Sequence, residues 1–310
     1  MRIAIIGRTR WLLNTARKLS QSGHDIVCVA TAKAEPSYGC GPDDFEALAR
    51  QTGARFLGVV SLANPEVSSS VRACKPDLAV SVNWPKILGS AELDLFPQGV
   101  VNAHAGDLPR YRGNACPNWA ILNGEDRIGL CAHIMTPGDV DAGPVLLRDY
   151  LKITDQTYIG DVYEWLDATI PRLFTDAING FSTGDIEPIP QPSDPALALR
   201  CFPRRPEDGH IAWNHSVANI HRLIRASSKP FDGAFCFLTD GRRMTIWRGR
   251  PFEFPSPFCA VPGQIMVRHE GDPVVACGEG ALRLELVEIE GETPTASKAL
   301  VTRSVRERLA

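Results

Sequence analysis

Short apolar runs alternate with helical patterns through the first half of the chain, and this alternation constrains the fold more than any other feature. Four nearly continuous hydrophobic runs of strand length occur at residues 2–6, 25–31, 56–60 and 77–82. Apolar side chains recur at helical spacing between them, at residues 11–20, 43–50 and 64–73. Strands that are apolar on both faces and separated by helices predict a parallel sheet covered on both sides. In such a sheet, ligands bind at the carboxyl ends of the strands, where the strand order reverses.

A long helical pattern follows two more apolar runs of strand length. The two runs and the helix are predicted at residues 128–135, 143–150 and 157–179. Pro171 lies inside the helical pattern and is expected to kink or divide it, because proline removes a backbone donor. Gly180 is expected to end the helix.

Six prolines without periodicity fall between residues 184 and 206, which is typical of a linker. Five short strands with glycine turns come later, at residues 234–238, 243–247, 263–268, 273–276 and 281–288. Such strands favour a small β-barrel. We therefore expect a catalytic domain, a Pro-rich linker and a second domain, over residues 1–184, 185–203 and 204–310.

Charge and cysteine content exclude several classes of protein. The formal net charge is −3. Residues 201–310 hold 15 Lys+Arg and 13 Asp+Glu, giving +2, and residues 1–200 hold 18 and 23, giving −5. A second domain of +2 lacks the basic footprint of a nucleic-acid module. The short apolar run after Arg2 predicts a buried strand, not a signal peptide. Nine cysteines without C-x-x-C spacing favour free thiols in a reducing compartment.

The stretch from Asn102 to Asp141 holds the strongest catalytic candidates. Asn102 and His104 lie two residues apart after an apolar run, so in a strand their side chains share a face. A carboxamide can hold a developing oxyanion, and an imidazole can take a proton. Asp141, or Asp139 in the same loop, could orient the imidazole. Alone, a histidine after a strand is more often structural, and Asn102 alone could cap a turn.

Two arginine-rich segments are candidates for binding a phosphate. Arg8 and Arg10 follow the first strand, although the absence of G-x-G-x-x-G weakens a dinucleotide interpretation. Arg110 and Arg112 flank Tyr111, whose ring could stack on a base or sugar. Guanidinium groups suit bidentate phosphate binding. Equally, one arginine could pair with a local carboxylate and hold its loop.

Cys131 and His133 are spaced like a pair of metal ligands. No second pair accompanies them in the sequence, so core side chains on a strand are the better interpretation. We expect no metal site.

The segments N-x-H, LPRYRG and VDAGPV, at these spacings, resemble the 10-formyltetrahydrofolate-dependent formyltransferases. YRGNACPNWAILNGE is nearest to the enzymes that act on nucleotide-linked amino sugars. The resemblance implies a Rossmann-like α/β domain with a parallel sheet, followed by an OB-like β-barrel. It implies 10-formyltetrahydrofolate as formyl donor, no metal, and catalysis by Asn102, His104 and Asp141.

The resemblance also assigns binding residues. The folate pocket is expected to involve Asn83, Trp84, Ile87, Leu88, Asp139 and Val140. The acceptor side is expected to involve Arg8, Arg10, Arg110, Tyr111, Arg112 and Asn118. Asp107 departs from the small or apolar residue usual at its position in the family. For Trp84, a packed structural loop is an equally good interpretation.

We expect the acceptor to be the amine of a TDP- or UDP-linked amino sugar, as used in lipopolysaccharide O-antigen biosynthesis. The arginine cluster suits a diphosphate and exceeds what a free ornithine needs. Methionyl-tRNA, a hydroxylated ornithine for a siderophore, and a catalytically silent ligand-binding protein stay open as alternatives. We expect a cytoplasmic enzyme whose partners are a nucleotide sugar and folate, with nucleic acid and membrane disfavoured. A homodimer is left open.

Overall fold

The computed structural model describes residues 1–35, 38–301 and 308–310. The chain forms two compact units, each with its own hydrophobic core. Unit 1 comprises Met1–Cys116, Ile128–Leu151 and Glu164–Cys201. Unit 2 comprises Pro117–Arg127, Lys152–Tyr163 and Phe202–Ala310.

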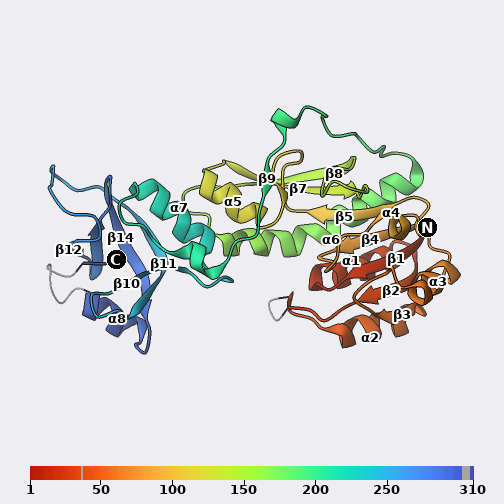
Figure 1. Cartoon of the computed structure of the whole chain (residues 1–310), viewed down its shortest axis with the longest axis horizontal. Coiled ribbons are helices and arrows are strands. Elements are labelled where there is room, and N and C mark those ends of the chain that lie inside the picture. The colour runs from red at the N-terminus through yellow and green to blue at the C-terminus, as the bar shows by residue number, and fades with distance from the viewer. Residues whose placement is uncertain (36–37, 302–307) are drawn as a thin grey trace. The chain divides into compact units, whose positions relative to one another are not determined.

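A seven-stranded sheet forms the centre of unit 1, in the order β3-β2-β1-β4-β5-β7-β8 (Figure 1). Its strands are β1 (Arg2–Gly7), β2 (Asp25–Thr31), β3 (Arg55–Gly58), β4 (Leu78–Val82), β5 (Val100–His104), β7 (Arg127–Ile134) and β8 (Val145–Lys152). The pairs β1–β2, β2–β3, β1–β4 and β4–β5 are parallel, whereas β5–β7 is antiparallel. The sheet is therefore mostly parallel, as predicted, and its order reverses between β1 and β4.

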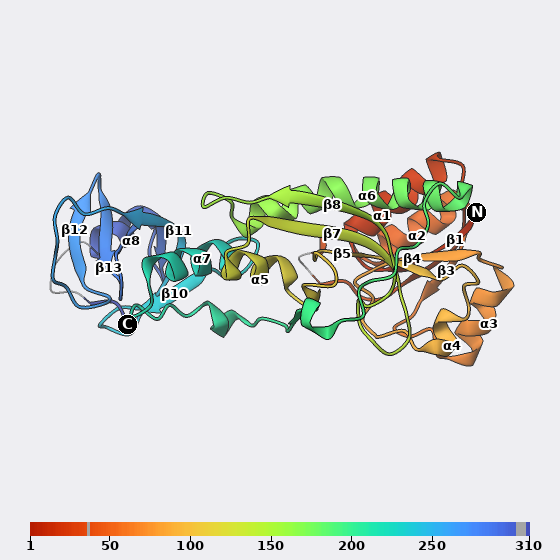
Figure 2. The ribbon, with the colours of Figure 1, turned by 90° about the horizontal axis from the view of Figure 1, so that it is seen from above.

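Helices cover both faces of this sheet, as expected for strands that are apolar on both sides. They are α1 (Arg10–Gln21), α2 (Pro42–Thr52), α3 (Pro65–Ala73), α4 (Ser90–Leu93) and α6 (Ile159–Thr183). Helix α5 (Cys116–Asn123) belongs, apart from Cys116, to unit 2. Figure 2 shows α1 and α6 on one side of the sheet and α3 and α4 on the other. All five residues of β4 are buried. The short helix α4 was not predicted, because four residues are too few to show periodicity.

Pro171 was expected to kink or divide helix α6 and Gly180 to end it, and the structure contradicts the division and the end at Gly180. The helix runs without division through Pro171 and through Gly180, and ends at Thr183. Its apolar face is fully buried at positions such as Leu173 and Phe174, so tertiary packing outweighs the local cost of proline and glycine. The helix is followed by Gly184, whose φ of 81° is the left-handed conformation typical after a helix end.

The proline-rich stretch after α6 runs along unit 1. Strand β9 (Arg200–Cys201) pairs in parallel with β6 (Arg112–Gly113). Ile189 forms an antiparallel bridge with Val145, with both backbone hydrogen bonds at 2.8–2.9 Å. The compact unit extends to Cys201. The boundaries expected at residues 184 and 203 stay a prediction, but this stretch is not an isolated tether.

Unit 2 is built around a five-stranded antiparallel sheet, in the order β10-β11-β14-β13-β12, which confirms the expected small β domain. Its elements after Phe202 are α7 (Val217–Ser227), β10 (Ala234–Phe237), β11 (Arg243–Phe252), β12 (Ile265–His269), β13 (Asp272–Ala276), β14 (Ala281–Ile289) and α8 (Pro294–Val301). Ile220 and Ile224 of α7 pack into its core with Leu282 and Leu284 of β14. Helix α8 was not predicted.

Among the residues that the structure describes, no helix is both long enough and apolar enough to span a membrane.

Candidate active site

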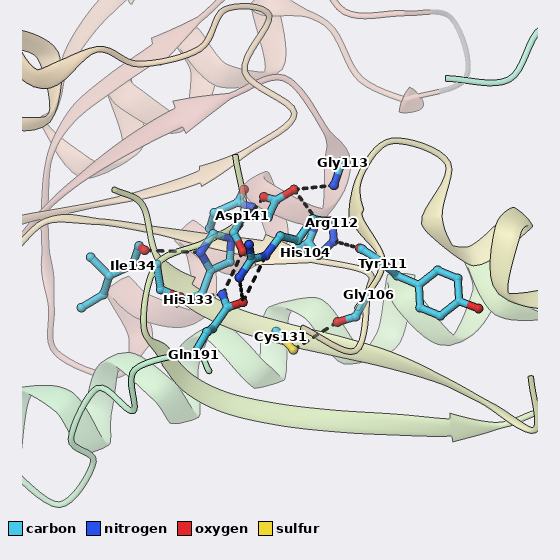
Figure 3. Close-up of polar contacts among 12 residues, drawn as sticks. His104, Gly106, Tyr111, Arg112, Gly113, Cys131, His133, Ile134, Asp141 and Gln191 are labelled. Atoms are coloured by element: carbon cyan, nitrogen blue, oxygen red, sulfur yellow. Dashed lines mark hydrogen bonds and ion pairs between the residues drawn. The ribbon is translucent and has the colours of Figure 1, made fainter. Parts of the chain in front are cut away.

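Strand β5 brings two of the predicted catalytic side chains to the carboxyl edge of the sheet. In the antiparallel pairing of β5 with β7, Asn102 lies opposite His133. Asn102 and His104 lie two residues apart in β5 and so share a face of the strand. Figure 3 shows the side chain of His133, from the neighbouring strand, close to His104 and Asp141. Asn102 Nδ2 lies 3.1 Å from His133 Nε2. The pairing therefore gathers a carboxamide and two imidazoles at one point.

Asp141 completes this group from the loop between β7 and β8. Its Oδ2 lies 3.3 Å from His104 Nδ1, and its Oδ1 lies 3.4 Å from His133 Nε2. The backbone N–H of Gly113 donates to Oδ2 at 2.9 Å. Asp141 has a φ of 57°, in the left-handed region that few residues other than glycine adopt, and such strain is often found at functional sites. The structure thus brings Asn102, His104 and Asp141 together.

The Asp141 carboxylate is held in its ionised form. Burial alone would raise the pKa of this carboxyl, but the hydrogen bond with His133, the charges of His104 and His133 and the Gly113 N–H together lower the pKa to about 2. Asp141 therefore carries a full negative charge beside His104 at any pH where the protein would work.

His104 is almost fully buried, and burial lowers the pKa of its imidazole, while Asp141 and the carbonyl of Tyr111 act in the opposite direction. Its Nε2 lies 2.5 Å from the carbonyl oxygen of Tyr111, and its Nδ1 faces Asp141. Both of these oxygens accept hydrogen bonds and neither donates. A neutral ring has one N–H, so only the protonated ring can donate to both. Burial therefore favours the neutral ring, whereas the two acceptor oxygens stabilise the proton that it accepts.

His133 was expected to be a core side chain, and it is 1% exposed. Its Nδ1 lies 3.3 Å from the carbonyl oxygen of Ile134. His133 Nε2 lies within reach of both Asn102 Nδ2, at 3.1 Å, and Asp141 Oδ1, at 3.4 Å, so the tautomer of the ring sets whether this nitrogen accepts from the amide or donates to the carboxylate. In either tautomer His133 contacts both the Asn102 carboxamide and the Asp141 carboxylate. In the sequence, the spacing C-x-H suggests only a metal ligand pair or core side chains, and the opposing register of β5 and β7 has no signature there.

The segment expected to bind folate follows β4. Leu88 is buried in the hydrophobic core, whereas Ile87 is 77% exposed. Trp84 Nε1 is buried without a hydrogen-bond partner among the described residues. Asn83 has a φ of 52°, and its carbonyl accepts from Arg8 Nε at 3.0 Å. An exposed apolar side chain and an unbonded buried N–H fit a segment that a ligand covers.

Asp139 and Val140, the other two residues expected at the folate pocket, precede Asp141 in its loop. Asp139 is exposed and Val140 is half-buried. Their roles stay predictions.

The predicted acceptor-side arginines differ in how they are held. Arg8 donates to the carbonyls of Asn83 and Lys33 and pairs with Glu35 at 3.3 Å, so local groups occupy much of its guanidinium. Arg10 is exposed. Arg112 donates from Nε and Nη2 to Gln191 Oε1, at 3.3 and 2.7 Å.

Tyr111 and Asn118 are packed inside the protein. Tyr111 is 4% exposed, and the guanidinium of the exposed Arg110 lies 5.5 Å from its ring centroid. Its ring therefore offers little surface for stacking on a base. Asn118 is 3% exposed and donates from Nδ2 to the carbonyl of Ala226 at 2.8 Å. These contacts give both residues a structural role, and their contact with substrate stays a prediction.

Asp107, the departure noted in the sequence, is tied to the neighbouring strand. Arg148 of β8 approaches Asp107 Oδ1 at 3.3 Å and donates to the carbonyl of Leu108 at 2.6 Å. The Tyr150 hydroxyl also donates to Asp107 Oδ1, at 3.1 Å. The carboxylate therefore helps to anchor the loop after His104.

No group of three or more histidine, cysteine, aspartate or glutamate residues suited to a metal ion occurs in the described part of the chain.

Comparisons with known proteins agree with this fold. Residues 1–178 match the family model described as formyl transferase, and residues 204–304 match the formyl transferase C-terminal domain. A methionyl-tRNA formyltransferase of a Methylobacterium species is 32% identical over 299 residues, which cover 94% of this chain and 93% of that protein.

Two solved structures share the fold. WlaRD, a sugar 3N-formyl transferase crystallised with dTDP and 5-N-formyl-THF, has a TM-score of 0.67 and 14% identity, covering 94% of this chain and 99% of that one. HypX of Aquifex aeolicus, in complex with tetrahydrofolic acid, has a TM-score of 0.62 and 16% identity. The alignment with HypX covers 96% of this chain but only 46% of that longer protein.

A mostly parallel α/β sheet with a carboxamide, an imidazole and a carboxylate at its carboxyl edge, followed by an antiparallel β domain, defines a group-transfer enzyme acting at a carbonyl carbon. This chain belongs to the formyl transferase family.

Proposed function

We propose that this enzyme transfers the formyl group of 10-formyltetrahydrofolate to the amine of a nucleotide-linked amino sugar. The observation that supports formyl transfer best is the meeting of Asn102, His104 and Asp141 at the carboxyl end of β5. Each group suits one demand of carbonyl addition by an amine. The formyl donor is 10-formyltetrahydrofolate, as the family implies.

The roles follow from the contacts. The amine adds to the formyl carbon, and the carbonyl oxygen becomes an oxyanion that the Asn102 amide N–H stabilises. His104 accepts the proton that the amine must lose, and Asp141 stabilises the resulting imidazolium from 3.3 Å. Collapse of the tetrahedral intermediate breaks its bond to the folate nitrogen, which takes up the proton held by His104 and leaves as tetrahydrofolate. Asn102, His104 and Asp141 can perform these steps without further groups.

The exposed side chain of Ile87 and the unbonded Trp84 Nε1 mark the segment after β4 as the side for the donor. A pterin ring offers both an apolar face and hydrogen-bonding edges, so it matches an apolar side chain beside an unsatisfied N–H. Structural neighbours solved with tetrahydrofolic acid and with 5-N-formyl-THF support a folate as the donor.

Charge and size both favour a nucleotide-linked amino sugar as the acceptor. Arg10 and Arg110, two of the residues predicted for the acceptor side, are exposed, and Gln191 links Arg112 to Asp141, so these residues offer positive charge to an anionic acceptor. A diphosphate is the natural partner for such cations. The near-neutral second domain, with 15 basic and 13 acidic residues, offers little to a polyanion as long as tRNA. A neighbour solved with dTDP supports a nucleotide-sugar acceptor.

A methionyl-tRNA acceptor is the second candidate, and sequence similarity favours it. Curated relatives that match the whole chain at about 30% identity are methionyl-tRNA formyltransferases. The two acceptors differ greatly in size and charge, so a direct comparison separates them.

The deciding experiment is a parallel panel of acceptors with 10-formyltetrahydrofolate, followed by release of tetrahydrofolate. The panel holds TDP- and UDP-linked 3-amino and 4-amino sugars, charged initiator tRNA and hydroxyornithine. We expect the highest kcat/KM with a nucleotide sugar. A higher kcat/KM with tRNA or hydroxyornithine than with every nucleotide sugar would reject the proposed acceptor but not formyl transfer.

A further inference from the structure

We propose that Gln191 is a positioning residue, and that residues 189–201 form a strap that holds the two catalytic loops of unit 1 in register. The loops are the segment 108–114 after β5 and the segment 136–144 between β7 and β8. This inference rests on the proposed role of Asp141, and it assigns a function to a stretch that the sequence presents only as a proline-rich linker.

Gln191 uses both ends of its carboxamide, and each end contacts a different loop (Figure 3). Its Nε2 donates to the backbone carbonyls of Asp141 at 2.8 Å and of Gly143 at 2.7 Å. Its Oε1 accepts from Arg112 Nε at 3.3 Å and Nη2 at 2.7 Å. A carboxamide has two N–H groups and an oxygen with two lone pairs, so these four contacts use its full capacity. One side chain therefore links the catalytic aspartate to the arginine of the other loop.

Backbone pairing on either side of Gln191 holds the same two loops. Upstream, Ile189 exchanges both backbone hydrogen bonds with Val145, just after the Asp141 loop. Downstream, the N–H of Arg112 donates to the carbonyl of Leu199 at 2.8 Å, and the N–H of Asn114 donates to that of Cys201 at 3.1 Å. The strap is thus anchored at both ends, and Gln191 lies between the anchors.

The strap approaches one loop too closely for a side chain. Gly113 has a φ of 100°, and a Cβ at this position would lie 2.3 Å from the carbonyl oxygen of Cys201. The same Gly113 donates its N–H to Asp141 Oδ2. Close contact with β9 therefore fixes the donor that meets the catalytic carboxylate.

These contacts give Asp141 two independent restraints. The Gly113 N–H and the two histidines hold its carboxylate, and Gln191 holds its backbone carbonyl. Asp141 has a left-handed backbone, with a φ of 57°, and the hydrogen bond from Gln191 to its carbonyl helps to hold that conformation. Releasing the carbonyl would let the carboxylate move from His104, and a displacement of about 1 Å in a catalytic group costs about 10²-fold in rate.

Two substitutions, by residues close to glutamine in size, test the Nε2 contacts and the Oε1 contacts of Gln191 separately. Gln191→Met removes every hydrogen bond. Gln191→Glu still accepts from Arg112, but its second oxygen faces the carbonyls of Asp141 and Gly143, which cannot donate. Gln98→Met, at an exposed glutamine in the same unit, is the matched control.

Hydrogen–deuterium exchange of the full-length protein tests the link without any acceptor. We expect faster exchange in peptides covering residues 138–145 for both Gln191 variants. Peptides covering residues 110–114 should exchange faster in Gln191→Met and as in the wild type in Gln191→Glu. Gln98→Met should leave both regions unchanged. Unchanged exchange at residues 138–145 in both Gln191 variants would overturn the inference, whatever their melting temperatures.

Steady-state kinetics with 10-formyltetrahydrofolate and the best acceptor of the panel gives the functional readout. We expect kcat to fall about 10²-fold in both Gln191 variants. The acceptor KM should rise only in Gln191→Met, because only this variant releases Arg112. A variant that only loses its fold has a lower melting temperature and a smaller fraction of active enzyme. Such a loss lowers the apparent kcat but does not raise the acceptor KM in Gln191→Met alone. Wild-type kcat in both Gln191 variants overturns the positioning role.

Asp141→Asn, measured beside these variants, separates the two proposals. Loss of kcat in Asp141→Asn together with normal kcat in the Gln191 variants refutes only the strap. Normal kcat in Asp141→Asn refutes the catalytic role on which the strap depends.

Discussion

Replacing Asp141 by asparagine should damage catalysis far more than it damages the fold. The carboxylate contacts His104, His133 and the Gly113 N–H, and these contacts hold its pKa at about 2 against an ordinary value of 3.8. An asparagine keeps the shape and can still accept from Gly113, but it cannot stabilise a protonated His104. We expect kcat to fall by about 10³-fold or more, the order found when a carboxylate behind a catalytic imidazole is neutralised.

The loss of stability expected in Asp141→Asn follows from the same lowered pKa of Asp141. A pKa lowered by nearly two units corresponds to about 2 kcal/mol of preference for the ionised carboxylate in the folded state. Because the folded pKa is depressed, this contribution is complete above pH 3.8 and is lost as the pH falls from 3.8 towards 2. The variant should therefore be about 2 kcal/mol less stable than the wild type at neutral pH, and this difference should shrink below about pH 4.

Urea unfolding of both proteins between pH 3 and pH 8, with kcat measured at neutral pH, tests both parts. The conservative size of the substitution keeps the packing comparable between the two proteins. A kcat within threefold of the wild type would refute the catalytic role of Asp141. A stability difference that grows on acidification would refute its assignment as an ionised, contact-stabilised carboxylate.

Three further predictions concern a second histidine of the site, a histidine of unit 2 and the thiols. His133→Phe should lower kcat about 10²-fold while changing the Kd of a folate analogue less than twofold, because it removes the ring nitrogen that contacts both the Asn102 amide and the Asp141 carboxylate. A kcat near the wild type would show that the site needs no such contact. Burial first, then the nearby Arg225, lowers the pKa of His221 to about 4. Folding favours the neutral ring of His221, so the contribution of this ring to the free energy of unfolding is complete above pH 6.5 and is lost as the pH falls towards 4. When the pH falls from 6.5 to 4, the free energy of unfolding of His221→Gln, measured by urea unfolding, should fall by up to about 3 kcal/mol less than that of the wild type. If the unfolding free energies of the two proteins change in parallel with pH, the assignment is wrong. All nine cysteines are free thiols, so a mild reductant should leave the melting temperature unchanged, and a large drop would reveal a disulfide.

The parts of the fold that the sequence predicts well are those that local pattern determines. The apolar runs that became β1, β2 and β4 are buried on both faces, so their composition alone distinguishes them from surface strands. Asn102 and His104 were placed together by the two-residue repeat of a strand, and the structure brings them together with Asp141. Local rules failed in α6, where Pro171 and Gly180 predict interruptions that burial of the helix overrides.

The parts of the site that the sequence could not predict depend on contacts between distant segments. His133 meets Asn102 only because β5 and β7 pair antiparallel in one register. Gln191 lies 50 residues beyond Asp141 in a stretch without periodicity, and hydrogen bonds of a single side chain leave no local pattern. Conversely, Tyr111 reads as a stacking platform in the sequence, but its ring is almost fully buried. Side-chain exposure in a loop depends on what packs over it, and a loop sequence does not state this.

The most direct test of the account is single-turnover release of tetrahydrofolate by Asn102→Ala and His104→Ala, measured beside their affinity for a folate analogue. The first variant removes the amide placed to hold the oxyanion, and the second removes the base beside Asp141. The account predicts a fall of about 10²-fold or more in the release rate of each variant, with analogue binding close to that of the wild type. Near-normal release by both variants would contradict it and would place formyl transfer elsewhere in the molecule.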